Sequence, residues 1–184
     1  LISRDHSAPV VEPSEARSFP IISLVGGKWT TFRGFAEEVA DMVLSRLGHQ
    51  RSISARDLPI GGGRDFPATD ARSAWIAAAV AASGATPARA ESLLARYGTT
   101  ASYILVAEGP MPEFLTDMPD HSVEEIDWIL RHEAVVHLED LVLRRTALAI
   151  TGQLSRRDLI RIADLTAAVL GWDISRRNQE LAMT

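Results

Sequence analysis

Val25-Gly26-Gly27-Lys28-Trp29-Thr30-Thr31 joins an apolar run to a helical pattern. The apolar run Phe19 to Val25 leads into the two glycines, and apolar residues at helical spacing follow them. A strand that passes through glycines into a helix N-terminus lets a ligand approach the backbone, where N–H groups and the helix dipole favour negative charge. The stretch predicts a strand-turn-helix corner that can hold an anion. A tight turn with an incidental lysine is the alternative.

Upstream of this corner the sequence predicts a β-hairpin. Val10-Val11 and Phe19 to Val25 are β-branched or apolar, and residues 12–18 between them are polar and turn-prone. Because the second run is apolar on both faces, we expect it to be buried in a larger sheet. The chain supplies little more sheet, and it begins at Leu1 without the layout of a signal peptide, so we expect a piece of a longer chain.

Downstream of the corner the pattern changes to that of an amphipathic helix. Thr30 or Thr31 can cap its start, and Gly48 can end it. Residues 49–70 are polar and rich in glycine, including Gly61-Gly62-Gly63, for which we expect a flexible or tight loop. We place the domain boundary there. The expected apolar face of the helix comprises Phe32, Phe35, Ala36, Val39, Met42, Val43 and Leu47.

Residues 67–184 are expected to form an all-helical domain, and residues 1–66 the end of an α/β domain, so the predicted fold class is mainly α. Ser122 and Glu125 have the spacing of a capping box, and glycines follow several of the helices. Trp75, Trp128, Trp172 and other large apolar residues fit buried stripes. The expected helices are 70–82, 87–97, 99–108, 122–131, 137–149, 155–170 and 173 to the end.

Composition excludes several classes of protein. The formal net charge of −5 gives no basic surface for nucleic acid, and the apolar fraction of 46% is that of a globular protein. The absence of cysteine excludes disulfides and fits a cytoplasmic compartment. The longest apolar run, Trp75 to Ala82, is far shorter than the about 20 residues that span a bilayer, so no transmembrane segment is expected.

Known phosphate and metal motifs do not fit this sequence. At the corner, Ile22 stands where a Walker loop needs its first glycine, and Phe66 breaks a dinucleotide fingerprint at Gly61-Gly62-Gly63. His132 and His137 lie about 140° apart on a helix, too far round it to share one metal ion. We therefore expect no metal site. The polar residues His132, Glu133, Glu139, Asp140, Arg144 and Arg145 are expected to be structural, with Asp140 and Arg144 paired at i, i+4.

The ordered motifs along the chain resemble the FAD-dependent glycerol-3-phosphate dehydrogenases and the related glycerol-phosphate oxidases. Two motifs of that family are matched here, by Ser3-Arg4-Asp5-His6 and by the helix start Gly26 through Arg33. A loop that follows them in the family resembles Leu58-Pro59-Ile60-Gly61-Gly62. The resemblance covers nearly the whole chain. Further matches lie at Arg96-Tyr97-Gly98, Arg131-His132-Glu133, Leu138-Glu139-Asp140 and Arg144-Arg145-Thr146.

The resemblance implies oxidation of sn-glycerol 3-phosphate to dihydroxyacetone phosphate by hydride transfer to FAD, with electrons passed to a membrane quinone. It places Gly26, Gly27, Lys28, Trp29 and Thr30 against the flavin, where backbone N–H groups would stabilise negative charge. It also implies that Lys28 is a substrate or flavin contact. Trp29 would shield the site from water.

Arg4 would match a family arginine near the substrate, since a guanidinium bonds two phosphate oxygens at once. A salt bridge in the hairpin is the alternative for Arg4, and an exposed lysine is the alternative for Lys28. Arg33 is expected to be a surface or interdomain charge. No residue of this chain is assigned a catalytic role, and the general base is expected outside it.

Two other functions stay open on sequence grounds. One is an oxidase that passes electrons to oxygen, and the other is a helical interaction module in which the glycine turn is only a boundary. The isolated chain is expected to be inactive, not to retain FAD, and to self-associate through its hairpin because the strand edge is free. The parent enzyme is expected in the cytoplasm with peripheral membrane association.

Overall fold

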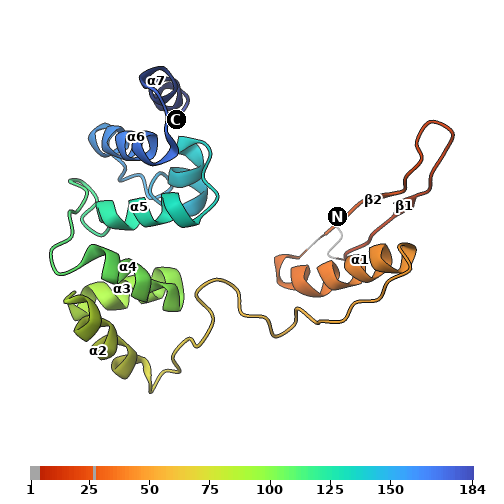
Figure 1. The fold of residues 1–184 in the computed structure, drawn as a ribbon, viewed down its shortest axis with the longest axis horizontal. Coiled ribbons are helices and arrows are strands. Elements are labelled where there is room, and N and C mark those ends of the chain that lie inside the picture. The colour runs from red at the N-terminus through yellow and green to blue at the C-terminus, as the bar shows by residue number, and fades with distance from the viewer. Residues whose placement is uncertain (1–4, 27) are drawn as a thin grey trace. The chain divides into compact units, whose positions relative to one another are not determined.

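The computed structural model describes residues 5–26 and 28–184, and the chain divides into two compact units, Leu1–Pro59 and Ile60–Thr184. In the described part, the first unit contains β1 (Val10–Val11), β2 (Ile21–Ile22), the short 3-10 turn η1 (Trp29–Thr31) and α1 (Phe32–Arg46). The second contains α2 (Arg72–Ser83), α3 (Pro87–Tyr97), η2 (Gly98–Thr100), α4 (Ala101–Glu108), α5 (Val123–His132), η3 (Asp140–Arg145), α6 (Arg156–Leu170) and α7 (Ile174–Met183). Figure 1 shows both units, and the predicted mainly α class with a hairpin is confirmed.

The hairpin is an antiparallel pair in which Val10 lies opposite Ile22 and Val11 opposite Ile21. An isolated bridge between Ser7 and Val25 extends the ladder towards the corner. Arg17 stabilises the turn at the other end, because its guanidinium donates to the carbonyls of Phe19 at 2.6 Å and Glu12 at 2.6 Å.

The expected burial of the second strand on both faces is not found within this chain. Phe19, Leu24 and Val25 are each at least half exposed, and Ile21 is exposed as well. The physical reason is that two strands and one helix cannot cover both faces. The ring of Phe35 in α1 packs against the tilted ring of His6, just before the hairpin, and the other apolar side chains of the strand stay open.

The start of α1 differs from the expected threonine cap. Neither Thr30 nor Thr31 caps the helix through its side chain; the Thr31 hydroxyl donates instead to the carbonyl of Lys28 at 3.1 Å, within the 3-10 turn. The expected end is confirmed, since α1 stops at Arg46 and Gly48 follows with a positive φ of 73°.

The helical unit has two apolar cores that share Tyr97 and Trp128 at their border. One core lies among α2, α3 and α4, and includes Leu93, Ile104 and Leu105, all without exposed surface. The other lies among α5, η3, α6 and α7. Figure 1 shows the two groups of helices in succession along this unit. Trp75, Trp128 and Trp172 pack against these cores, as their helical stripes predicted.

Most expected helices are found with caps that the sequence indicates. The side chains of Thr86, Ser122, Ser155 and Asp173 accept backbone N–H bonds at the starts of α3, α5, α6 and α7. The helix expected over residues 137–149 is shorter than predicted, since residues 138–145 are helical and η3 within them has the π form. The helix ends there because Thr146 is extended, with φ −132° and ψ 168°.

The glycine-rich loop before α2 is tight rather than flexible. The carbonyl of Gly62 accepts the N–H of Thr99 at 2.9 Å and its hydroxyl at 3.1 Å. A Cβ on Gly62 would lie 2.0 Å from the Tyr97 carbonyl oxygen, and Gly62 has a φ of 75°. Two backbones can cross this closely only at glycine. The loop is thus fixed to the second unit, while the assignment of residues 1–66 to a flavin-binding domain stays a prediction.

Candidate functional site

The Gly26–Thr31 corner is a strand-turn-helix junction, as the sequence predicts. Val25 is the last residue paired with the hairpin, with its N–H and carbonyl both bonded to Ser7 at 3.0 and 2.9 Å. Lys28 is extended, with φ −131° and ψ 129°, and the 3-10 turn leads into α1 at Phe32. Helix starts leave N–H groups without intrahelical partners, which favours a negative group at this corner.

The described residues of the corner lie at the surface. No atom lies within 4 Å of a Cβ built on Gly26, and Lys28 and Thr30 are exposed. Trp29 is 88% exposed and stacks on Phe32, with ring centroids 5.9 Å apart. A flat ligand can therefore approach the backbone and this aromatic pair. The predicted shielding of the site by Trp29 stays a prediction.

Lys28 is the sole lysine in the sequence, which also contains eighteen arginines. An ammonium group is a compact, strongly hydrated point charge, while a guanidinium makes planar, two-pronged bonds. The position of this one lysine at the corner fits a ligand that requires a point charge there.

Arg4 and Gly27 lie outside the described residues, so their predicted roles in substrate and cofactor binding stay predictions. Asp5 and His6 are the described residues of the Ser3-Arg4-Asp5-His6 stretch, and His6 Nε2 lies 3.1 Å from the Glu38 carboxylate of α1. This contact brings the end of that stretch onto the helix that begins at the corner.

Arg33 has a role that the sequence did not reveal. Expected to be a surface or interdomain charge, it instead donates from Nη1 to the carbonyls of Ala55, Arg56 and Leu58, at 2.6, 2.9 and 2.7 Å. One turn on, Glu37 accepts from Ser54 at 2.9 Å. These bonds hold the loop after α1 against the helix. The sequence contained one sign of this contact: Arg33 and Glu37 are spaced i, i+4, which places both side chains on the same side of the helix.

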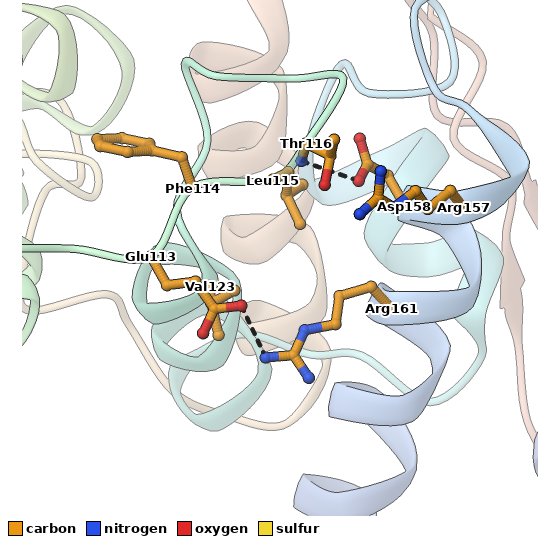
Figure 2. Close-up of a pocket in the computed structure, with 8 residues that line it drawn as sticks. All are labelled: Glu113, Phe114, Leu115, Thr116, Val123, Arg157, Asp158 and Arg161. Carbon is orange, nitrogen blue, oxygen red and sulfur yellow. Dashed lines mark hydrogen bonds and ion pairs between the residues drawn. The ribbon is translucent and has the colours of Figure 1, made fainter.

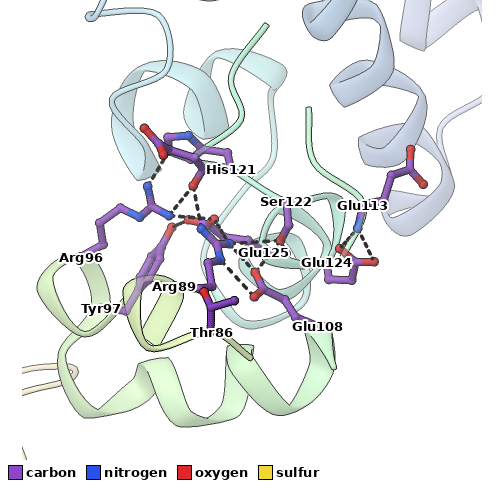
Figure 3. Close-up of polar contacts among 11 residues, drawn as sticks. Thr86, Arg89, Arg96, Tyr97, Glu108, Glu113, His121, Ser122, Glu124 and Glu125 are labelled. Atoms are coloured by element: carbon purple, nitrogen blue, oxygen red, sulfur yellow. Dashed lines mark hydrogen bonds and ion pairs between the residues drawn. The ribbon is translucent and has the colours of Figure 1, made fainter. Parts of the chain in front are cut away.

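The helical unit contains a buried ionic cluster between α3, α4 and α5, drawn in Figure 3. The Arg89 guanidinium lies between the carboxylates of Glu108 and Glu125, both without exposed surface. Arg89 is 2.8 Å from Glu125 and donates to the carbonyl of Asp120 at 2.7 Å. Ser122 donates to Glu108 at 2.6 Å. This arrangement joins elements far apart in sequence, which is why spacing did not predict it.

The expected capping box is only half formed because of this cluster. The Ser122 hydroxyl accepts the N–H of Glu125 at 2.9 Å, as predicted. The Glu125 carboxylate, however, accepts from Arg89, Arg96 and Tyr97. A buried carboxylate without a compensating charge costs more free energy than a helix start without a second cap.

The cluster shifts the protonation equilibria of its members. Burial and the neighbouring Glu125 carboxylate raise the pKa of Tyr97 far above its usual value, and burial lowers the pKa of His121. Burial opposes the charge on Arg89, but its bonds to Glu108 and Glu125 outweigh that effect and raise its pKa. At neutral pH Tyr97 and His121 are uncharged. The cluster is a balanced structural group, not a poised acid or base.

A small pocket of about 180 Å³ lies between the 113–116 segment and the start of α6 (Figure 2). Three of its charged groups, Glu113, Asp158 and Arg161, are engaged with one another or with the backbone. Asp158 accepts the N–H groups of Thr116 and Asp117, at 3.0 and 2.8 Å, and Arg161 is 2.9 Å from Glu113. The Asp158 carboxylate thus fixes this segment to α6.

The polar residues around His132 make contacts within the helical unit, and their predicted structural role stays a prediction. His132 stacks on Trp128 with ring centroids 4.5 Å apart, and its Nδ1 lies 2.8 Å from the Trp128 carbonyl oxygen. The i, i+4 pair of Asp140 and Arg144 is confirmed at 2.9 Å.

Within residues 5–26 and 28–184, no group of His, Cys, Asp and Glu is arranged to hold a metal ion. The helices of this described part also include none that is long and apolar enough to cross a membrane.

Fold and corner together define a mainly helical module preceded by a hairpin and a strand-turn-helix junction. A family model, the C-terminal domain of alpha-glycerophosphate oxidase, matches residues 53–177. The chain belongs to this family, which confirms the resemblance found in the sequence.

Curated relatives extend the similarity beyond that domain. Glycerol-3-phosphate dehydrogenase 2 of Mycobacterium tuberculosis is 27% identical over 98% of this chain, which corresponds to 30% of the relative. Glycerol-3-phosphate dehydrogenase 1 of the same organism is 32% identical over 81% of the chain and 26% of the relative. The probable mitochondrial glycerol-3-phosphate dehydrogenase of Dictyostelium discoideum is 26% identical over 98% of the chain and 27% of the relative. The chain thus spans less than a third of the length of these relatives.

Proposed function

We propose that this chain is part of a flavoenzyme that oxidises sn-glycerol 3-phosphate to dihydroxyacetone phosphate, with FAD as the hydride acceptor. One observation carries the proposal: relatives named glycerol-3-phosphate dehydrogenases align over 98% of the chain, so the similarity includes the Gly26–Thr31 corner as well as the helical domain. Because the chain spans less than a third of those relatives, the activity is proposed for a longer protein that contains it.

The described corner fits one edge of a planar cofactor. Gly26 is open on its Cβ side, Lys28 is exposed, and the Trp29 and Phe32 rings lie beside it. Bound FAD would supply the hydride-accepting chemistry. Gly26, Gly27, Lys28, Trp29 and Thr30 would hold it there, with their backbone N–H groups and the helix dipole favouring negative charge.

Lys28 and Arg4 are the residues proposed to meet the charge of the substrate. The ammonium of Lys28 would stabilise negative charge at the flavin edge or on the phosphate, and the guanidinium of Arg4 would bond two phosphate oxygens. Arg33 has a supporting part in this proposal, because it holds the Ala55–Leu58 backbone against the helix that starts at the corner.

The electron acceptor is proposed to be a membrane quinone, with the parent enzyme in the cytoplasm and bound peripherally to the membrane. The relatives named dehydrogenases favour this choice. An oxidase that uses oxygen is the second candidate, and the family named after alpha-glycerophosphate oxidase favours it. Oxygen consumption during turnover with glycerol 3-phosphate, with and without a quinone analogue, separates the two.

Flavin absorbance tests the proposal directly. We expect the purified full-length parent to be yellow and to bleach on anaerobic addition of glycerol 3-phosphate. The isolated 184-residue chain should bind no FAD, because the corner offers only one edge of the cofactor and the pyrophosphate site would lie elsewhere. A colourless parent would overturn the function, and stoichiometric FAD on the isolated chain would overturn the division of the site.

Replacement of the sole lysine tests the corner itself. In the parent enzyme we expect Lys28→Ala to lower turnover by about 10²- to 10³-fold, the usual effect of losing one preorganised donor. Lys28→Arg keeps the charge and should retain more activity, which makes it the matched control. Unchanged turnover in Lys28→Ala would assign Lys28 to the plain surface.

A further inference from the structure

The two sides of the glycine corner are joined by a turn that offers little restraint. Val25 ends the hairpin ladder, and α1 begins at Phe32 on the other side of the turn. No atom lies within 4 Å of a Cβ built on Gly26, and residues 28–31 are exposed. We call residues 5–25 the strand arm. The angle between the strand arm and α1 therefore depends on contacts outside the turn.

His6 contacts both sides of the corner. Next to it in the strand arm, Ser7 exchanges two backbone hydrogen bonds with Val25, at 2.9 and 3.0 Å. The His6 ring lies on the ring of Phe35 in α1, with centroids 4.6 Å apart and planes tilted by 36°. Its Nε2 is 3.1 Å from the Glu38 carboxylate. One side chain thus links the end of the strand arm to the first two turns of α1.

The two partners of His6 lie on one side of the helix. Phe35 and Glu38 are spaced i, i+3, so they are neighbours on the surface of α1. Phe35 is buried, whereas the Glu38 side chain is 63% exposed. The ring contact buries apolar area, and the hydrogen bond fixes the orientation of the imidazole. A phenylalanine at position 6 could supply the first contact but not the second.

A second contact holds the other end of α1. The Arg46 guanidinium donates to both carboxylate oxygens of Glu12, at 2.9 and 2.6 Å, so α1 runs alongside the hairpin from the corner (Figure 1). At 1.5 Å per residue, Arg46 lies about 21 Å from the start of α1 at Phe32. Without the His6 contact, a tilt of α1 by about 3° about its Arg46 end moves the corner by about 1 Å. A displacement of that size can slow an oriented reaction by about 10²-fold.

We propose that His6 is a positioning residue of the flavin site, and that it holds the Gly26–Thr31 corner in place against the cofactor by linking the strand arm to α1. The inference rests on the proposed function, because it concerns the same corner. Hydrogen-bond donors stabilise developing charge only where they are preorganised. Without His6, the N–H groups of the corner and the Lys28 ammonium are held less firmly, so negative charge at the flavin edge is less stabilised.

Amide hydrogen exchange tests the structural part of the proposal without using activity. In the full-length parent, His6→Ala should speed exchange in the peptide that spans residues 25–32 by about tenfold, because local opening of the corner becomes easier. His49→Ala, which replaces an exposed histidine of the same unit, should leave that exchange unchanged. Equal exchange in His6→Ala and the wild type would overturn the proposal.

Turnover and the flavin midpoint potential test the functional part. We expect His6→Ala to lower kcat by about 10- to 100-fold and to make the potential more negative, whereas His49→Ala should change neither. His6→Phe keeps the ring contact and should have an intermediate effect. Glu38→Ala alters an exposed position, so the fold should persist, and it should match His6→Phe because each variant loses the same hydrogen bond.

The combined variant separates positioning from stability. His6→Phe with Glu38→Ala should be no worse than either single variant, because both substitutions remove one contact. Variants with lower melting temperatures but unchanged kcat and potential would overturn the proposal, since they would assign His6 to stability alone. That result in a parent that is yellow and oxidises glycerol 3-phosphate would leave the proposed function standing, whereas a colourless parent would overturn both.

Discussion

The two units of this chain are stabilised in different ways. In Leu1–Pro59, Phe35 and Val39 are the buried hydrophobic residues of the described part, and polar contacts such as the Arg46–Glu12 pair hold α1 to the hairpin and the following loop. Ile60–Thr184 contains two apolar cores and an ionic cluster whose two carboxylates, Glu108 and Glu125, are fully buried. Exposed ion pairs contribute about 0–1 kcal/mol each, whereas burial of a large apolar side chain contributes about 1.5–3 kcal/mol.

This difference indicates which unit can fold by itself. We expect burial in the two cores to offset the conformational entropy of the helical unit, whereas Phe35 and Val39 alone should not do so for the hairpin unit. The exposed apolar residues of the hairpin, Phe19, Leu24 and Val25, are those that a larger sheet would cover.

Separation of the units should give the largest effect. We expect residues 60–184 to unfold in one cooperative thermal transition, and residues 1–59 to show none by circular dichroism or calorimetry. A third fragment, residues 67–184, should also unfold cooperatively but at a lower temperature, because it lacks the Gly62 carbonyl that Thr99 binds. A cooperative transition in residues 1–59, or none in residues 60–184, would show that the comparison is wrong.

Removal of the central cation of the ionic cluster should be nearly as severe. Arg89→Met leaves Glu108 and Glu125 buried with only Arg96 nearby, and loss of one partner from a buried ion pair costs about 3–5 kcal/mol. Urea unfolding of the chain measures this loss. Arg144→Met removes two ion pairs at an exposed guanidinium, with Glu139 and Asp140, and should cost about 0–1 kcal/mol for each. Equal losses in the two variants would contradict the distinction between buried and exposed pairs.

The backbone crossing at Gly62 should have a smaller effect on the same unit. Gly62→Ala places a Cβ against the Tyr97 carbonyl and forces a left-handed φ on alanine, a conformation that costs about 1–3 kcal/mol. Gly61→Ala is the matched control, since no atom lies within 4 Å of a Cβ there. We expect a lower melting temperature for the first variant only. Indistinguishable melting curves would mean that the loop is not fixed to the α3–α4 corner.

A pH dependence at the end of the helical unit should be the smallest effect. Burial alone would raise the pKa of Glu180, but the N–H of Leu138, the His137 ring and Arg176 hold that pKa below its usual value. Its folded-state pKa is thus below the unfolded value, so its stabilisation is complete above pH about 5 and is lost as pH falls through the folded pKa. Glu180→Gln should flatten stability against pH below 5. Parallel curves for both proteins would refute this role.

Much of the local structure could be predicted because it depends on near neighbours. The strand-turn-helix corner, the cap at Ser122 and the glycine stop after α1 each follow from residues within a few positions of one another. The failures have physical causes too. The helix expected over 137–149 stops at Arg145 because Thr146 is extended and its N–H bonds to the carbonyl of Leu141 in the wider π pattern. The threonine cap was wrong because Thr31 binds Lys28 instead.

The mainly α class, the hairpin before the glycine corner, most helix positions and the family resemblance can be read from the sequence, because period, caps and motif order are local properties of a chain. The long-range contacts appear only in the folded molecule. It brought Arg89 to Glu125 across thirty-six positions, Arg33 to the carbonyls of Ala55 and Leu58, and Gly62 to Thr99. Such partners follow from how helices pack, and burial then decides which carboxylates and backbones need them.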